Sequence, residues 1–242
     1  MWTVSRMIGL PIMCVHAHRP PERNLNTDRW RRQSHSGKSQ CDRIATYSQH
    51  ASRLTITRFL EREALTSFPK ASIVLLRPSM SYMLMQTAEP LTLKEVLPNF
   101  ATTTHVFLPI NDNIDVTNAE GGSHWSLLLV SIIDGVSFHY DSMSQSNLRE
   151  AQNTTRKMEQ LLGKRLRFIA MEDSPQQENG SDCGVFVCVL MRHLLLKRLL
   201  RADASKKVSM AMRDAHINAK DGRKTMLRII DERKKEGERR RS

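Results

Sequence analysis

The chain has 242 residues, and its hydrophobic fraction of 40% is sufficient for the core of one soluble domain with extensions. The formal net charge of +12 lies at the two ends: residues 1–50 hold eight Lys and Arg against three Asp and Glu, and residues 192–242 hold seventeen against seven. No apolar stretch approaches the roughly 20 residues of a membrane-spanning helix, so we expect no membrane partner. Because no stacking motif or groove-reading module accompanies the basic ends, we do not expect nucleic acid as the main partner.

Residues 1–50 are predicted to be an N-terminal extension that is disordered or incorrectly assigned, because they are polar, basic and without sustained periodicity. Apolar residues in the segment 54–65 follow an approximate helical stripe. Residues 73–76 are a candidate strand, and Pro78 suits the first turn of a helix. Thr92 and a Glu three residues later form a T-x-x-E capping box, which predicts a short helix ending near the next proline.

Three β-rich runs follow, and the dipeptide Asp134–Gly135 predicts a two-residue hairpin between the last two of them. The runs are 105–110, 125–133 and 136–140. Beyond them the pattern predicts a helix, stopped by Gly163, then a strand and a polar loop, and two further helices. In that order, the first helix spans 148–162, the strand 166–171, the loop 172–182, and the two further helices 183–200 and 206–236.

Helices, then a compact β run, then helices are typical of the α+β class. We therefore divide the chain into three parts: the N-terminal extension 1–50, a folded domain over 51–205, and a basic C-terminal helix or tail over 206–242.

The four cysteines, Cys14, Cys41, Cys183 and Cys188, show no CxxC pair and no metal-ligand spacing. We expect reduced thiols in the cytoplasm or nucleus, no metal and no cofactor. Cys183 stands where a polar loop becomes a long apolar helix, and a helix N-terminus favours a thiolate. Considered alone, Cys183 is as readily an inert core residue, which is the interpretation that fits Cys188 inside the apolar run.

A nucleophilic cysteine needs a base, and that base needs a third group to orient it. His124 precedes one strand of the predicted hairpin and Asp141 follows the other, so both should emerge at the same edge of the sheet. Alone, each has a structural interpretation, but pairing across the hairpin favours catalysis. His139 competes as the base; its place inside a strand indicates a sheet residue.

Attack on an amide also needs hydrogen-bond donors for the developing oxyanion. Gln177 lies in the polar loop six residues before Cys183, where its side-chain amide can fold back over the thiol. The alternative interpretation is a glutamine that faces water. The backbone N–H of Cys183 would be the second donor.

These motifs resemble the ubiquitin-like-modifier (Ulp/sentrin-specific) cysteine protease family, on the segments GGSHWSLLL, HYDS and PQQENGSDCGVFVC. The resemblance covers roughly residues 58–200 and implies a papain-like fold with a small mixed sheet flanked by helices. It implies Cys183 as nucleophile, His124 as base, Asp141 as its orienter and Gln177 at the oxyanion. It also implies that Trp125 lines a tunnel for the Gly-Gly tail of the modifier.

The spacing of His124 and Asp141, with the phrase FLPINDN, is most similar to the small deneddylase branch. The resemblance implies processing or deconjugation of a ubiquitin-like modifier, Nedd-type rather than SUMO, by a monomer without a cofactor. The sequence departs from the pattern of this family in two places. No W-L-N-D segment is found in residues 1–57, and Ser181 replaces an aromatic residue.

We expect the N-terminal difference to come from an incorrect or alternative first exon. The alternative function is a modifier-binding protein with a defective substrate site. A further alternative is a basic polyanion-binding protein, whose affinity would fall steeply with salt.

Overall fold

A computed structural model of the chain describes residues 56–118, 121–201, 208–213, 215 and 217–240. These described residues belong to one compact unit. The predicted N-terminal extension lies outside the described residues, and the division of the chain at 50 and 205 stays a prediction.

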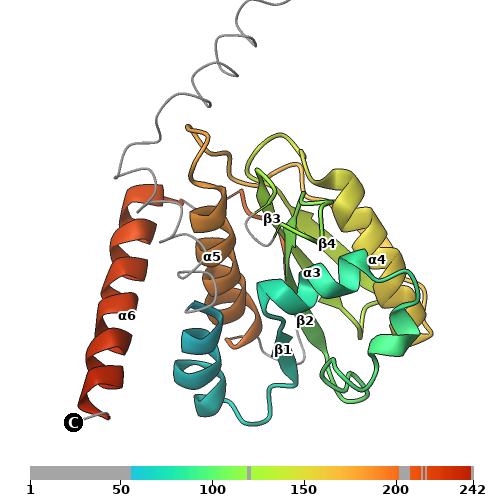
Figure 1. Cartoon of the computed structure of the whole chain (residues 1–242), viewed down its shortest axis with the longest axis horizontal. Helices are drawn as coiled ribbons and strands as arrows, with labels where there is room; N and C mark the ends of the chain where they lie inside the picture. Colours follow the sequence, from blue (N-terminus) through green and yellow to red (C-terminus); the bar gives the residue numbers. More distant parts are fainter. Residues whose placement is uncertain (1–55, 119–120, 202–207, 214, 216, 241–242) are drawn as a thin grey trace, which may run out of the picture. The chain divides into compact units, whose positions relative to one another are not determined.

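Five strands form a single mixed sheet in the order β1-β2-β3-β4-β5 (Figure 1). The strands are β1 (Ile73–Leu75), β2 (His105–Asn111), β3 (Trp125–Ser131), β4 (Val136–Tyr140) and β5 (Arg167–Ala170). The central strands β2, β3 and β4 pair antiparallel, whereas the outer strands β1 and β5 each pair parallel to a neighbour. The sheet and its helices confirm the predicted α+β class.

The helices occupy both faces of the sheet. They are residues 56–63, η1 (Leu65–Ser67), α3 (Pro78–Gln86), η2 (Pro90–Leu93), α4 (Leu148–Leu162), α5 (Cys183–His193), the π-helical turn η3 (Leu194–Leu199) and α6 (Ala219–Arg239). Pro78 begins α3, as its fixed backbone angle predicts. Gly163 ends α4 in the left-handed conformation at φ 60°, where its N–H donates to Gln160.

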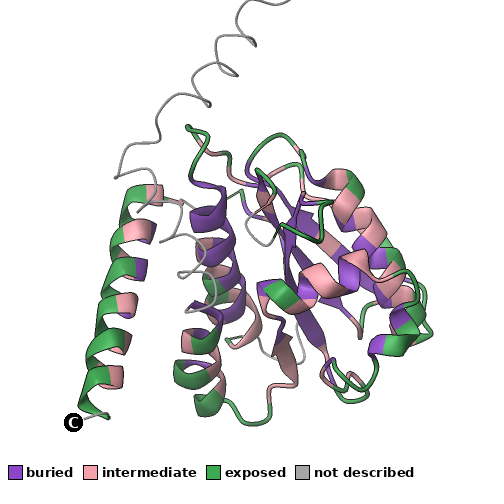
Figure 2. Ribbon diagram, in the orientation of Figure 1, coloured by how far each residue is buried: buried purple, intermediate pink, exposed green. Residues whose placement is uncertain are grey.

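Alternate side chains of the central strands enter two separate cores, which explains why these strands are continuously apolar. Phe107, Leu127 and Leu129 pack with α5 and α6 on one face. Val106, Leu108 and the other alternating residues pack with α3 and α4 on the opposite face. Figure 2 shows the strands buried between helices whose outer surfaces are exposed. The sheet is therefore held rigidly from both sides.

Three local predictions are wrong. Instead of the capped helix, a 3-10 turn covers Pro90–Leu93. The Thr92 hydroxyl donates to the carbonyl of Glu89 and so does not cap a helix. The hairpin closes at the Ser131–Val136 pair, so four residues rather than two form the turn. The C-terminal helix begins at Ala219, after an irregular segment.

No helix in the described part of the chain has the length and apolar character of a membrane span. Within the same residues, no group of three His, Cys, Asp or Glu side chains is arranged to hold a metal ion.

Candidate active site

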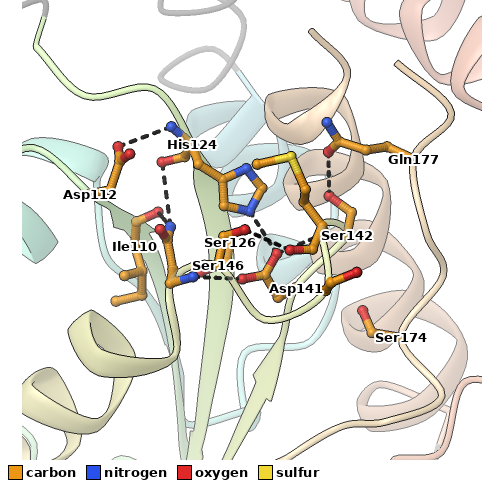
Figure 3. A network of polar contacts seen from close by, with 12 residues as sticks. Ile110, Asp112, His124, Ser126, Asp141, Ser142, Ser146, Ser174 and Gln177 are labelled. Atoms are coloured by element: carbon orange, nitrogen blue, oxygen red, sulfur yellow. Dashed lines mark hydrogen bonds and ion pairs between the residues drawn. The ribbon is translucent and has the colours of Figure 1, made fainter. Parts of the chain in front are cut away.

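The β3–β4 hairpin brings His124 and Asp141 together at one edge of the sheet. His124 directly precedes β3 and Asp141 directly follows β4. Nε2 of His124 lies 2.6 Å from Oδ1 of Asp141, and the two residues are 2% and 1% exposed (Figure 3). The hairpin argument from the sequence therefore predicted this contact.

Main-chain donors hold the Asp141 carboxylate in place. The N–H of Met143 donates to Oδ1 and the N–H of Asn147 donates to Oδ2, both at 2.9 Å. Burial by itself raises the pKa of Asp141, but the hydrogen bonds from His124 and these two amides outweigh it and lower the pKa below its ordinary value. Asp141 therefore stays ionised and orients the imidazole.

His124 is also fixed through its own backbone, by the last residue of β2 and the residue after it. Its N–H donates to Oδ1 of Asp112 at 2.9 Å, and its carbonyl accepts from Nδ2 of Asn111 at 3.0 Å. Asp112 further accepts the N–H of Ser123 at 2.7 Å. These anchors were missed from the sequence, although a run of Asn and Asp at the end of a buried strand was a signal that could have indicated them.

Gly122 is required in the loop before His124. It adopts φ +84°, and a Cβ there would lie 2.4 Å from the Asn111 side chain and 2.7 Å from the Asp112 carboxylate. A larger residue would both strain the backbone and displace the groups that hold His124.

Cys183 is the first residue of α5 and is 3% exposed. It lies in the positive end of the helix dipole, as the sequence predicted, and its thiol interacts with the His124 imidazole. Because Nε2 serves Asp141, Nδ1 is the buried nitrogen left for the thiol. Such contacts commonly tighten when substrate binds.

The electrostatics favour a charged imidazole next to the cysteine. Burial lowers the pKa of His124, but the hydrogen bonds to Asp141 and Cys183 and the negative charges of both raise the pKa from 6.5 to about 9. An imidazolium at neutral pH stabilises a neighbouring thiolate. The arrangement thus fits an ion pair of Cys183 and His124, oriented by Asp141.

His139 is a sheet residue, as predicted, and does not replace His124. Its Nε2 lies 2.9 Å from the Ser126 hydroxyl and 4.0 Å from Oδ2 of Asp141. Burial lowers the pKa of His139 to about 4, against the opposing effect of Asp141. His139 is therefore neutral at physiological pH and lies beside Asp141.

Gln177 is held beside the strand end that carries Asp141. Its Oε1 accepts from the Ser142 hydroxyl at 2.7 Å (Figure 3). Its Nε2 donates to the carbonyl of Asn179 at 2.7 Å. The carbonyl can only accept, which fixes the orientation of the amide. An amide nitrogen carries two hydrogens, so one remains for a second acceptor. The oxyanion role of Gln177 stays a prediction.

Trp125 begins β3, is partly buried and packs against the core that contains α5. Its tunnel-lining role also stays a prediction. The sequence missed Gln176, whose Nε2 donates to the Asp141 carbonyl at 3.0 Å and whose Oε1 accepts the N–H of Ser144. Two adjacent glutamines of the loop before α5 therefore hydrogen-bond to the residues that follow β4.

The comparisons with known proteins agree with this geometry. Residues 83–227 match the model of the Ulp1 protease family, C-terminal catalytic domain, and include His124, Asp141, Gln177 and Cys183. The chain belongs to this family. The match confirms the resemblance that the sequence motifs carried.

NEDD8-specific protease 2 of Schizosaccharomyces pombe is 37% identical over 173 residues, which cover 70% of this chain and 41% of that protein. Sentrin-specific protease 8 of Homo sapiens is 45% identical over 85 residues, which cover 34% of this chain and 39% of that protein. The matched part of the chain therefore spans about two fifths of the length of these relatives.

The fold is similar to that of the Chaetomium thermophilum Ulp1-like SUMO protease catalytic domain. The TM-score is 0.51 at 15% identity, with 75% of this chain and 68% of that chain covered.

Proposed function

We propose that this protein is a cysteine protease that hydrolyses the bond after the C-terminal Gly-Gly of a ubiquitin-like modifier. The observation that carries the proposal is the buried contact between His124 and Asp141, with the Cys183 thiol against the same imidazole at the start of α5. Membership of the Ulp1 protease family supports the reaction class.

In the first half-reaction, the Cys183 thiolate attacks the carbonyl carbon of the terminal glycine. The oxyanion that forms accepts hydrogen bonds from the Cys183 N–H and the side-chain amide of Gln177. His124 then gives its proton to the leaving amine, which is a lysine side chain or the N-terminus of a peptide extension. The C–N bond breaks and a thioester between Cys183 and the modifier remains.

In the second half-reaction, neutral His124 removes a proton from water, and the resulting hydroxide attacks the thioester carbonyl. The C–S bond breaks, the modifier leaves as a carboxylic acid that loses its proton to solvent, and the thiolate and imidazolium are regenerated. Asp141 remains ionised throughout and stabilises each imidazolium.

We further propose a preference for a Nedd-type modifier over SUMO. Two relatives from Schizosaccharomyces pombe, with 37% and 34% identity, support this choice, since both are NEDD8-specific proteases. The modifier-binding alternative without turnover is not favoured, because Cys183, His124 and Asp141 lie together in one buried site.

The proposal is tested with modifier–coumarin substrates of Nedd-type, SUMO and ubiquitin. Cys183→Ala should lower kcat/KM by about 10⁴-fold or more, since the nucleophile cannot be replaced. Cys188→Ala is the matched control, because Cys188 is equally buried in α5 but lies inside the core.

Three results would overturn the proposal. Normal turnover by Cys183→Ala would exclude Cys183 as the nucleophile. An equal loss of kcat/KM in Cys188→Ala would indicate that both substitutions act through the structure. A wild-type protein that binds a modifier without any turnover would favour the modifier-binding alternative. Faster turnover of SUMO than of the Nedd-type substrate would contradict the proposed preference alone.

A further inference from the structure

The C-terminal helix α6 lies unusually close to the helix that carries the nucleophile. At Gly222 an added Cβ would be 2.7 Å from Val189 and 3.0 Å from Val185, both on α5. Met226 and Ile229 extend this contact into the core. The absence of a side chain at Gly222 therefore lets the first turns of α6 approach the first turns of α5.

The segment before α6 is fixed to the same half of the domain. The Asp173 carboxylate accepts the N–H of Met212 at 2.7 Å, and the Tyr140 hydroxyl donates to the carbonyl of Met210 at 2.8 Å. Tyr140 is the last residue of β4 and directly precedes Asp141. The position of α6 is thus tied to the strand that the catalytic aspartate follows.

Arg223, adjacent to Gly222, reaches the loop that ends at the nucleophile. Its guanidinium donates to the Asp182 carboxylate and lies 3.3 Å from the Ser181 hydroxyl. The Asp182 side chain is only 8% exposed and Arg223 is 36% exposed, so the pair is partly shielded from water. Asp182 immediately precedes Cys183, and its carboxylate does not cap α5.

The same network includes the predicted oxyanion donor. Nδ2 of Asn179 donates to Oδ2 of Asp182 at 2.6 Å, and the carbonyl of Asn179 accepts from Gln177. Arg223, Asp182, Asn179 and Gln177 therefore form one chain of contacts that runs past Cys183.

A carboxylate next to a thiolate opposes its negative charge, unless a cation compensates it. We propose that Arg223 of α6 is a positioning residue that neutralises Asp182 and holds the loop 177–183 in the geometry that keeps Cys183 reactive. The inference rests on the proposed role of Cys183. The charged groups around this cysteine are His124 before β3, Asp141 after β4, Asp182 before α5 and Arg223 on α6.

The test uses the full chain with Arg223→Gln, Arg223→Lys and the control Lys224→Gln. Lys224 is the next residue of α6, is 68% exposed and pairs only with its helix neighbour Asp221 among the described residues. Two readouts are taken: kcat and KM on a modifier–coumarin substrate, and the pH dependence of Cys183 alkylation by iodoacetamide, read on its peptide by mass spectrometry.

Arg223→Gln should lower kcat by about threefold to tenfold with KM changed less than about twofold, because the loop and charge act on the nucleophile rather than on modifier binding. The alkylation midpoint should move to higher pH by about half a unit, Arg223→Lys should recover part of both effects, and Lys224→Gln should match the wild type. Adding Asp182→Asn to Arg223→Gln should return the midpoint toward the wild-type value, since the uncompensated charge is then gone.

An Arg223→Gln protein with the kcat and alkylation midpoint of Lys224→Gln would overturn the inference. So would a double variant whose midpoint stays as high as that of Arg223→Gln. If circular dichroism shows Arg223→Gln to be unfolded, Arg223→Lys is compared with the double variant instead. A kcat equal to that of the wild type in both of these variants would refute the positioning role of Arg223. Failure of the wild type to turn over any modifier would instead overturn the proposed function, and the alkylation readout would still report on Arg223.

Discussion

The two halves of the active site are held in different ways. The acid–base half, His124 and Asp141, is fixed by the strand pairing of one hairpin, by main-chain N–H groups and by the side chain of Asp112 in the neighbouring loop. The nucleophile half is fixed by side chains, above all Arg223, which is 41 residues beyond Asp182 in the chain. Strand pairing survives most single substitutions, whereas a side-chain anchor is lost with one. We therefore expect the first half to depend on its own hairpin and on Asp112, and the second to depend on α6.

The largest effect is expected where the acid–base half itself is broken. Asp141→Asn should lower kcat/KM by about 10³-fold to 10⁴-fold, because the amide cannot stabilise the imidazolium. The measurement is steady-state turnover of a modifier–coumarin substrate.

The matched control is Asp134→Asn at the opposite end of the same hairpin, where the carboxylate accepts only from Ser131 among the described residues. It should retain wild-type turnover. Equal losses in both variants would indicate that the hairpin, and not the charge of Asp141, is responsible.

The next effect concerns the one side-chain carboxylate that anchors the acid–base half. Asp112→Ala removes the acceptor for the N–H groups of Ser123 and His124, so kcat/KM should fall by about tenfold. Asp115→Ala, an exposed residue of the same loop that bonds locally to Thr117, is the control and should fall by less than twofold. A larger loss in Asp115→Ala would contradict the anchoring role of Asp112.

The charge on His124 should also be visible in stability. Its pKa in the folded state, about 9, exceeds the ordinary value of 6.5, so its stabilising contribution is complete below pH 6.5 and is lost as the pH rises through 9. Between pH 7 and pH 10, Tm of the wild type should fall by roughly 5 °C more than Tm of His124→Gln. Parallel Tm profiles in differential scanning fluorimetry would show that His124 carries no shifted charge.

The smallest effect is expected behind the site. His139→Gln keeps a donor for Ser126 but loses the ring contact with Phe168, so kcat should fall by less than about fivefold. Because the pKa of His139 is about 4, the profile of kcat/KM between pH 6 and pH 10 should keep its shape. A shifted limb in that range would identify His139 as a titrating participant.

Local signals predicted much of this molecule. The hairpin dipeptide, the glycine that ends α4 and the polar-to-apolar boundary at Cys183 each depend on neighbours within a few residues. The apolar runs predicted the five strands, and the hairpin dipeptide predicted the His124–Asp141 contact. The turn length was wrong because Gly135 adopts a positive φ at the end of a four-residue loop rather than within a two-residue one.

The long-range anchors could not be predicted in this way. The contacts of Arg223 with Asp182 and of Asp173 with Met212 arise only when α6 and the segment before it pack against α5. The C-terminal stretch was predicted as a basic helix or tail, and its helix α6 buries Met226 and Ile229 in the core. One face of α6 is therefore structural, and charge alone did not indicate it.

The central claim is that one cysteine is activated by the His124–Asp141 pair. A Nedd-type modifier carrying a C-terminal electrophile should form a single covalent adduct, and intact mass and peptide mapping should place it on Cys183. The adduct should form at the wild-type rate in Cys188→Ala, about 10²-fold or more slowly in His124→Gln, and not at all in Cys183→Ala. An adduct on Cys188, or one that persists in Cys183→Ala, would contradict the assignment of the nucleophile.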